Sequence, residues 1–272
     1  MTIPSAPSAA AAVEPRPAAS LILLRDGADG LEVFMIERHR NLAFAPGATV
    51  FPGGRLEAAD HAPHWRAVWS AGAAVAVPDD LPRRIAAIRE AFEECGLLLA
   101  RQSIDGPADG PAVESRLSAL RAAMAAGSPF AEALQAAGLA AAPEATVPLS
   151  HWVTPEPRPR RFNTLFFLAA APPGQEPVVD GGEAVAGGWG TPGGFLAAAG
   201  AGRCRLVFVT WMILRRLARC ATLAEAFADA GRHALQPILP RLIETPAGSV
   251  WRIPAGCGYD PTDTPVEKVA IG

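Results

Sequence analysis

The chain has 272 residues, of which 50% are hydrophobic and 19% are charged, and its formal net charge is −3. A half-apolar composition excludes a globally disordered chain. Without a basic excess, we expect no nucleic-acid partner and no membrane partner. The four cysteines form no C-x-x-C pair, so we expect free thiols in a reducing compartment, the cytoplasm.

The first third of the chain is predicted to begin with a tail and continue as strands. Residues 1–18 are rich in Ala and Pro and are expected to be disordered. Ser20–Arg25 and Leu31–Glu37 are apolar runs separated by turn residues, which predicts a β-hairpin with a longer loop. Ala48–Phe51 predicts another short strand, ended by the turn residues Pro52-Gly53-Gly54.

The rest of the chain mixes helices and strands without regular βαβ alternation. The uncharged stretch Ala184–Gly202 is studded with glycines and is expected to form loops. This mixture predicts an α/β (α+β) fold with a mixed sheet between helical layers. The expected elements are a helix over Asp80–Gly96, helices in Ala112–Leu139 broken near Gly127, strands over Val147–Thr154 and Phe162–Ala169, helices over Thr210–Cys220 and Thr222–Gly231, and a strand over Val250–Ile253.

The helix predicted over Asp80–Gly96 carries an acidic face. Glu90, Glu93 and Glu94 are spaced i, i+3 and i+4 and therefore lie on one side. Clustered carboxylates with no lysine among them are typical ligands of Mg²⁺ or Mn²⁺ together with substrate phosphate oxygens. The alternative is a merely solvated acidic face. The opposite side is apolar, with Leu81, Ile85, Ile88, Phe92 and Cys95.

Two segments together resemble the Nudix box. The first is Gly54-x5-Asp60, and the second is Arg89-Glu-Ala-Phe-Glu-Glu-Cys-Gly-Leu97. Asp60 stands where the family has Glu, and 28 residues separate Asp60 from Arg89 where the family has seven. This insertion resembles the acyl-coenzyme A diphosphatase branch of the Nudix hydrolases. Further matches to that branch are Arg38, Gly47-x3-Phe51-Pro-Gly-Gly54, Trp152-Val-Thr-Pro155, Arg161-Phe-Asn-Thr164 and Asp180-Gly-Gly-Glu183.

The resemblance implies a Nudix-type α/β/α sandwich with a mixed β-sheet and helical insertions. Residues 19–272 would form a single Nudix hydrolase domain, with insertions at about 61–80 and 101–146 and a C-terminal extension over 233–272. The implied activity is metal-dependent hydrolysis of the diphosphate linkage of coenzyme A or acyl-coenzyme A. The products would be (acyl-)phosphopantetheine and adenosine 3',5'-bisphosphate.

The resemblance also implies roles for individual residues. Glu90, Glu93, Glu94 and the Gly53 carbonyl would hold Mg²⁺ or Mn²⁺, and Arg89 would orient the carboxylates. The general base stays open between Glu183 and a glutamate of the box. The residues expected to bind substrate are Arg38, Arg40, Phe51, Gly54 and Arg161, with Arg158 and Arg160 as further phosphate-binding candidates.

Several alternatives remain open from the sequence. The chain could hydrolyse another nucleoside diphosphate derivative, such as ADP-ribose or a dinucleotide, or be a non-catalytic nucleotide-binding Nudix module. Trp65 and Trp69 could cover the site or pack a satellite core. A small nucleotide is the expected partner, and a homodimer is a candidate assembly.

Overall fold

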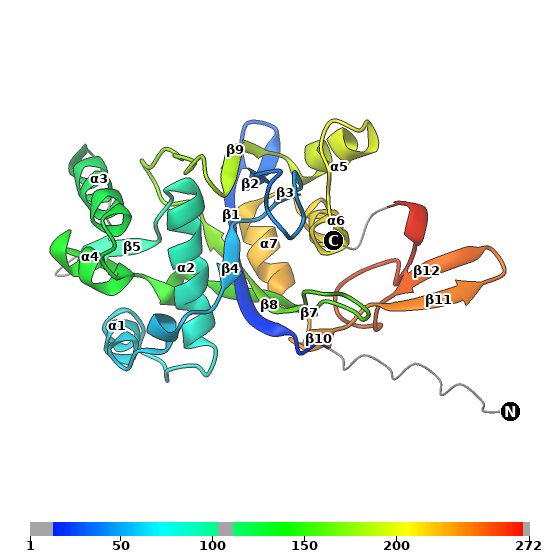
Figure 1. The fold of residues 1–272 in the computed structure, drawn as a ribbon, viewed down its shortest axis with the longest axis horizontal. Helices are drawn as coiled ribbons and strands as arrows, with labels where there is room; N and C mark the ends of the chain where they lie inside the picture. Colours follow the sequence, from blue (N-terminus) through cyan, green and yellow to red (C-terminus); the bar gives the residue numbers. More distant parts are fainter. Residues whose placement is uncertain (1–12, 103–110, 269–272) are drawn as a thin grey trace, which may run out of the picture.

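A mixed eight-stranded sheet forms the centre of the computed structural model, which describes residues 13–102 and 111–268 (Figure 1). Strand β1 is parallel to β8 and antiparallel to β2 and β4. The sheet follows the order β10 (Pro237–Ile238), β7 (Val147–Val153), β8 (Phe162–Ala170), β1 (Arg16–Gly27), β2 (Gly30–Arg38) and β3 (Thr49–Val50), with β4 (Gly53–Arg55) paired to β1 and β9 (Ala184–Gly190) paired to β2.

Alternation along β1 divides the hydrophobic core between the two faces of the sheet. Successive side chains of a strand point to opposite faces. Leu21 and Leu23 pack in one cluster of buried residues, whereas Ile22 and Leu24 pack in a second cluster. All four side chains are fully buried, so β1 is covered on both sides.

Helices cover both faces and produce the predicted α/β/α sandwich (Figure 1). One face carries α1 (His64–Gly72), α2 (Leu81–Cys95), α3 (Pro111–Ala125) and α4 (Phe130–Ala136). The other face carries α5 (Pro192–Gly200), α6 (Phe208–Leu217) and α7 (Leu223–Ala230). No helix within the described residues has the length and apolarity needed to cross a membrane.

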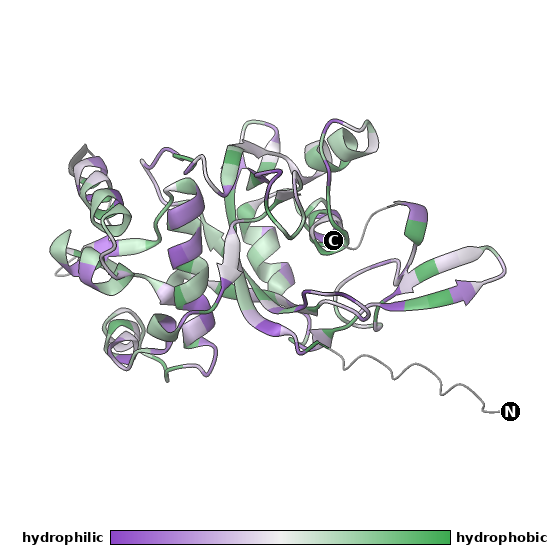
Figure 2. Cartoon of the chain, in the orientation of Figure 1, coloured by the Kyte–Doolittle hydropathy of each residue, from purple (hydrophilic) through white to green (hydrophobic). Residues whose placement is uncertain are grey.

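Helix α2 begins and ends where its sequence predicts. Asp80 occupies the N-cap position, a proline lies in the first turn, and Gly96 ends the helix with a φ of +71°. The Asp80 carboxylate binds Arg84 at 2.7 Å instead of a backbone N–H of the first turn. The apolar side of α2 is buried, and hydrophilic bands mark its other side in Figure 2.

Three expectations about the N-terminal strands need correction. The predicted tail over 1–18 is too long because β1 begins at Arg16, where pairing with β8 starts. Residues 1–12 lie outside the described residues. The hairpin loop is shorter than expected, since Gly27 already pairs with Gly30. Gly53 and Gly54 lie in β4 instead of a turn, because this segment pairs with β1.

The expectation of loops over Ala184–Gly202 was wrong, because this segment forms β9 and α5. The glycines of β9 permit close packing, since a Cβ on Gly187 would lie 2.8 Å from the Phe34 ring. Pro192 occupies the first turn of α5, where its missing N–H costs little. The Thr191 hydroxyl accepts a hydrogen bond from the Gly194 N–H and caps this helix.

The predicted insertions and the C-terminal extension lie at opposite ends of the molecule in Figure 1. The insertions contain α1, α3, α4, most of a small sheet of β5 (Ala100–Gln102) and β6 (Leu139–Ala141), and η2 (Pro143–Ala145), and η1 (Ala58–His61) immediately precedes the first insertion. Residues 103–110 lie outside the described residues. The extension contains β10, η3 (Val266–Lys268) and a sheet of β11 (Arg241–Thr245), β12 (Gly248–Arg252) and β13 (Asp263–Pro265).

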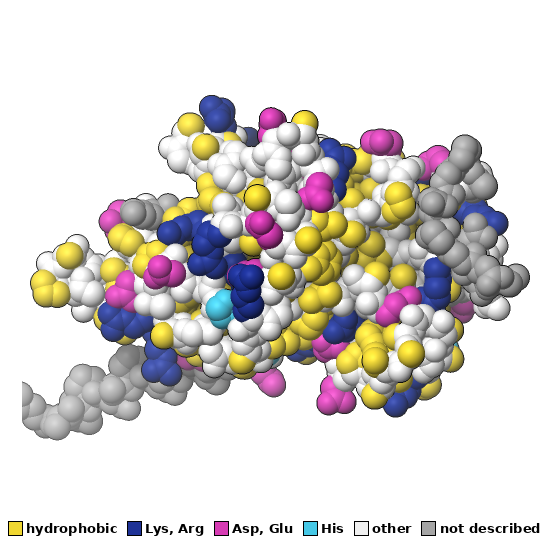
Figure 3. Space-filling view, turned by 180° about the vertical axis from the view of Figure 1, so that it is seen from behind, with side chains coloured by type: hydrophobic (Ala, Val, Ile, Leu, Met, Phe, Trp, Pro, Cys, Tyr) yellow, Lys and Arg dark blue, Asp and Glu magenta, His cyan; other side chains and the backbone are white. Residues whose placement is uncertain are grey.

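The surface opposite to the view of Figure 1 has no single dominant charge. Figure 3 shows acidic and basic side chains interspersed around a central band of hydrophobic side chains. Leu242 on β11 is 53% exposed, and Leu239 just before this strand is also exposed.

Candidate active site

Two adjacent glycines bring β4 into close contact with α2. The Gly53 N–H donates a hydrogen bond of 2.8 Å to Glu94 Oε2. A Cβ on Gly53 would lie 2.4 Å from the Ala19 carbonyl oxygen, and a Cβ on Gly54 would lie 2.4 Å from the Glu90 carboxylate. Only residues without a side chain therefore allow the carboxylates of α2 to approach this strand so closely.

Arg89 connects the two halves of the Nudix-like motif. Its Nε and Nη2 donate to both oxygens of Asp60 at 3.1 and 3.0 Å. Its Nη1 donates to Glu90 at 3.0 Å and to Glu93 at 3.1 Å. Asp60 also accepts from the Glu57 N–H at 2.8 Å, so it braces the loop against the helix despite replacing the family's Glu. Arg89 thus has the contacts expected of a group that orients carboxylates.

The site carries more negative charge than its own cations neutralise. Burial first, and the charges of Glu93 and Glu183 after it, raise the pKa of Glu90 to about 7 against the opposing effect of Arg89. Burial likewise raises the pKa of Glu94 to about 8, with contributions from Glu90 and Glu183. These carboxylates would be stabilised by an added cation.

One oxygen of the Glu94 carboxylate makes no hydrogen bond within the described part of the chain. This oxygen, Oε1, is buried, and Arg38 Nη1 lies 3.6 Å away. Arg38 Nε is also buried and lacks a partner in the same part of the chain. Glu94 Oε1 therefore has the chemistry of an open ligand for a hard cation.

The residues present fit Mg²⁺ or Mn²⁺ as an open site. Within the described residues, no three His, Cys, Asp or Glu side chains form a ready-made metal cage. Glu93 is directed to Arg89, and Glu94 is directed to Gly53, so the expected convergence of three carboxylates is not present in this geometry. Mg²⁺ commonly binds one or two carboxylates and completes its shell with water and substrate phosphates.

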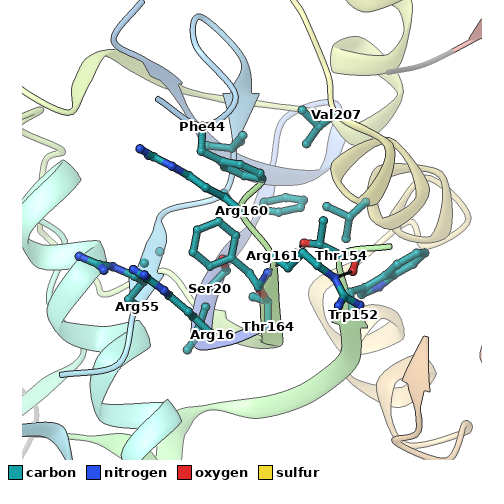
Figure 4. Close-up of a pocket in the computed structure, with 18 of the residues that line it drawn as sticks. Arg16, Ser20, Phe44, Arg55, Trp152, Thr154, Arg160, Arg161, Thr164 and Val207 are labelled. Carbon is teal, nitrogen blue, oxygen red and sulfur yellow. Dashed lines mark hydrogen bonds between the residues drawn. The ribbon is translucent and has the colours of Figure 1, made fainter. Parts of the chain in front are cut away.

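A cleft of about 930 Å³ lies beside Glu90 and Glu93 of α2, whereas Glu94 lies buried behind them and is not among the described residues that line it. Its floor is one face of the sheet, where the register places Arg16, Ala18 and Ser20 of β1 beside alternate residues of β8. Trp152 of β7 and Val207 near the start of α6 lie at the other side of the cleft in Figure 4. Glu90, Glu93 and Glu183 line it at the α2 end.

Glu183 enters the cleft from a turn that Asp180 organises. The Asp180 carboxylate accepts from the N–H groups of Gly182, Glu183 and Ala184 at 3.0, 2.7 and 2.8 Å. The Glu183 carbonyl accepts from the His39 N–H at 2.8 Å. The backbone of Glu183 is therefore fixed while its side chain remains exposed. Sequence analysis noted the Asp-Gly-Gly-Glu pattern but gave Asp180 no role.

The structure brings most of the expected substrate-binding residues to the cleft. Arg38, Phe51, Gly54 and Arg161 line it. The Arg161 guanidinium donates to the Thr154 carbonyl, the Val13 carbonyl and Glu156 at 2.7 to 2.9 Å, so protein groups already satisfy it. Arg40 and Arg158 lie outside the cleft as the described residues define it.

Sequence analysis missed Arg16 and Arg55, which also line the cleft. Arg16 lies in the part of β1 that precedes the predicted strand Ser20–Arg25, and Arg55 lies in β4, which the sequence did not predict. Arg16 is on the same side of β1 as Ser20, and Arg55 directly follows the glycine pair. The position of Arg55 after the glycines was the signal that could have identified it.

A second cavity of about 1490 Å³ lies between α2 and the helical insertions. It meets the first cleft at Glu57, Arg89 and Glu93, which line both cavities. Trp65 lines the second cavity, and both Trp65 and Trp69 are at least 95% buried in the core on this face of the sheet. Of the two alternatives for the tryptophans, the structure favours packing.

The sandwich, the carboxylate-bearing helix and the adjoining glycine strand define a hydrolase of the Nudix class. Comparisons with known proteins agree. The family model described as the NUDT19 Nudix domain matches residues 70–199. Acyl-coenzyme A diphosphatase NUDT19 of Homo sapiens is 30% identical, over 84% of this chain and 72% of the human protein. The Gallus gallus protein of the same name is 28% identical, over 55% of this chain and 54% of that protein.

A solved structure shows the same fold. The NUDIX hydrolase from Alicyclobacillus acidocaldarius superposes with a TM-score of 0.67 at 28% identity, covering 80% of this chain and 97% of that one. The chain therefore belongs to the Nudix hydrolase family, in the branch represented by the NUDT19 Nudix domain.

Proposed function

We propose that this protein hydrolyses the diphosphate linkage of coenzyme A or acyl-coenzyme A, with Mg²⁺ or Mn²⁺ as cofactor. The products are (acyl-)phosphopantetheine and adenosine 3',5'-bisphosphate. The observation that carries the proposal is the carboxylate face of α2, held against Gly53 and Gly54 at the end of a cleft. The human relative's name, acyl-coenzyme A diphosphatase, supports this choice of substrate.

The box residues hold the cofactor in this proposal. Glu90, Glu93, Glu94 and the Gly53 carbonyl are the ligands. When bound there, a divalent ion would neutralise diphosphate oxygens and lower the pKa of the attacking water. Arg89 keeps Glu90 and Glu93 in place through its hydrogen bonds, and the Gly53 N–H keeps Glu94 in place. The unpaired Nε of Arg38 donates to a diphosphate oxygen.

Glu183 is the favoured general base. Water attacks one phosphorus, the bond from that phosphorus to the bridging oxygen breaks, and the proton of the water passes to a Glu183 carboxylate oxygen. The Glu183 side chain is exposed and its backbone is held by Asp180. A group that accepts a proton from water in the cleft needs both features. Glu93 and Glu94 are the alternative bases, but both already accept hydrogen bonds from Arg89 and Gly53.

The test is a hydrolysis panel with the purified full chain. Coenzyme A, acetyl-coenzyme A, ADP-ribose and diadenosine polyphosphates are incubated with Mg²⁺ or Mn²⁺, and products are separated by chromatography. Release of adenosine 3',5'-bisphosphate from coenzyme A, at the highest kcat/KM of the panel, is the expected result. A preference for ADP-ribose or a dinucleotide would overturn the substrate assignment. Binding without turnover would instead indicate a non-catalytic module.

The remaining expectations concern partners and location. We propose a small nucleotide as the partner, no nucleic-acid or membrane partner, a cytoplasmic location, and a homodimer as a candidate assembly. Sedimentation equilibrium of the full chain tests the assembly, and a single species at 28.2 kDa would exclude the dimer.

A further inference from the structure

We propose that Arg16, Arg55 and Arg160 form a subsite for a phosphate monoester, which would take the 3'-phosphate of coenzyme A. The inference rests on the proposed function, because it names the part of the substrate that these residues recognise. The ligand class is a nucleoside diphosphate derivative that carries an additional phosphate on its ribose.

The sheet register brings the three arginines to one side of the cleft. Arg55 of β4 is adjacent to β1 because it pairs opposite Ala18, and Arg16 lies two residues earlier on the same face of β1. Arg16 pairs with Phe162 of β8, and Arg160 precedes Phe162 by two residues. In Figure 4, Arg16 and Arg55 lie next to each other and Arg160 reaches toward the same side of the pocket, opposite Trp152 and Val207.

These arginines differ from the others that line the cleft. Arg89 is bonded to Asp60, Glu90 and Glu93, Arg161 is bonded to Glu156, and Arg38 lies near Glu94. The side chains of Arg16, Arg55 and Arg160 have no hydrogen bond or ion pair to any residue within 13–102 and 111–268, and all three residues are exposed. Three arginine side chains without an acidic partner among the described residues therefore line the side of the cleft that lies opposite Trp152 and Val207.

A phosphate monoester matches this arrangement better than the diphosphate does. The diphosphate must lie against the carboxylates of α2, where the proposed cofactor and Arg38 neutralise it. A monoester carries a charge of about −1.5 to −2 at neutral pH. Guanidinium groups bind phosphate through paired, charge-assisted hydrogen bonds. Three guanidinium groups without acidic partners can supply several such bonds.

Neighbouring side chains suit the rest of a nucleotide. Ser20 and Thr164 line the same floor, and their hydroxyl groups make no hydrogen bond to another described residue. The rings of Phe44 and Phe162 meet edge to face with centroids 4.9 Å apart and also line the cleft. Aromatic side chains of this kind provide contact surface for a base.

The test uses two pairs of ligands, and the two members of each pair differ only in the 3'-phosphate. Hydrolysis is measured with coenzyme A and 3'-dephospho-coenzyme A, and binding to the full chain is measured by calorimetry with adenosine 3',5'-bisphosphate and 5'-AMP. The variants are Arg16→Ala/Arg55→Ala and Arg160→Ala, and Arg66→Ala on the exposed side of α1 is the matched control. Thermal melts identify any variant that does not fold. For such a variant, lysine replaces each arginine instead of alanine.

We expect wild-type protein and Arg66→Ala to favour the 3'-phosphorylated member of each pair by roughly tenfold or more, as charged hydrogen bonds allow. The arginine variants should lose this preference while keeping their kcat/KM for 3'-dephospho-coenzyme A. Equal losses on both members, or no preference in the wild type, would overturn the inference. If no form of coenzyme A is hydrolysed, the proposed function fails, and the calorimetric pair still decides whether the subsite exists.

Discussion

The Gly53 N–H donates to Glu94 Oε2 at 2.8 Å, although the two residues are 41 positions apart in the chain. This bond ties β4 to the last turn of α2, while Glu94 Oε1 makes no hydrogen bond within the described residues and has only Arg38 Nη1 at 3.6 Å as an ion-pair partner. Glu94 is 3% exposed, and its pKa is raised to about 8. Such a carboxylate is costly to the fold, and the proposed role of Glu94 as a cofactor ligand would account for it.

Replacing Glu94 by Gln should remove turnover without unfolding the protein. The amide keeps the size of the side chain and an oxygen that accepts from Gly53, but it removes a cofactor ligand. We expect kcat/KM to fall by roughly 100-fold or more, because metal-assisted charge stabilisation amounts to several kcal/mol. Melting temperature should stay equal or rise, since a buried charge is lost. Glu132→Gln, on the exposed surface of α4, is the control, and unchanged turnover in Glu94→Gln would contradict the metal-site assignment.

Removing Arg89 should affect stability as well as activity. Arg89 and Asp60 are 4% and 2% exposed and are joined through two nitrogen–oxygen contacts. Arg89→Met leaves a buried carboxylate without its partner, which typically costs about 3–5 kcal/mol of unfolding free energy. Urea denaturation measures this loss.

A second substitution separates the stability effect from the catalytic one. Arg89→Met combined with Asp60→Asn should recover much of the lost unfolding free energy, because the charge of the most deeply buried partner of Arg89, Asp60, is removed together with it. Turnover should stay low, because Glu90 and Glu93 still lack the group that positions them. Recovery of turnover together with stability would show that Arg89 has only a structural role.

The sequence predicted α2 and its acidic face because their signals are local. The cap position of Asp80, the terminal Gly96 and the i, i+3, i+4 spacing of the glutamates all lie within one helix. The start of β1 and the existence of β4 depend instead on pairing between distant segments, which overrides local composition. Arg16 and Arg55 were missed for the same reason, since only the register places them on one face.

The direction of each side chain also escaped prediction. Helical spacing puts Glu90, Glu93 and Glu94 on one side, but partners from other elements decide where each carboxylate points. Asp60 accepts a hydrogen bond from the Arg89 guanidinium, which also donates to Glu93, and the Gly53 N–H donates to Glu94. A periodic pattern cannot identify such partners in advance.

The two glycines of β4 should respond differently to alanine. In Gly54→Ala the three atoms nearest to the new Cβ all belong to the Glu90 carboxylate, at 2.4 Å, and that side chain can move aside. In Gly53→Ala the new Cβ meets the Ala19 carbonyl at 2.4 Å, a backbone atom that cannot move without disturbing β1. We expect Gly54→Ala to lose activity with little change in melting temperature, and Gly53→Ala to lose both.

The control for this pair is Gly193→Ala in α5, where a Cβ would meet nothing within 4 Å. Alanine at that position should leave activity unchanged and stability equal or slightly higher. Kinetic assays and thermal melts of the three variants provide the comparison. Full activity in Gly54→Ala would show that the position of Glu90 does not matter for turnover.

Divalent cations should stabilise the protein more strongly as the pH rises. In the metal-free protein, burial first and neighbouring carboxylates second raise the pKa of Glu90 to about 7 and of Glu94 to about 8, from 4.5. Between pH 4.5 and those values the native protein holds protons that the unfolded chain has released. Stability is therefore highest at low pH and is lost as the pH rises through the native pKa values.

Cation binding requires the deprotonated carboxylates and reverses this loss. Thermal melts with Mn²⁺ and with EDTA, at about pH 6 and about pH 8.5, should show a larger Mn²⁺-induced increase in melting temperature at the higher pH. In Glu90→Gln/Glu94→Gln both the cation effect and its pH dependence should disappear, since neither side chain titrates or binds. An increase of the same size at both pH values would contradict the assignment of these two glutamates as the ligands.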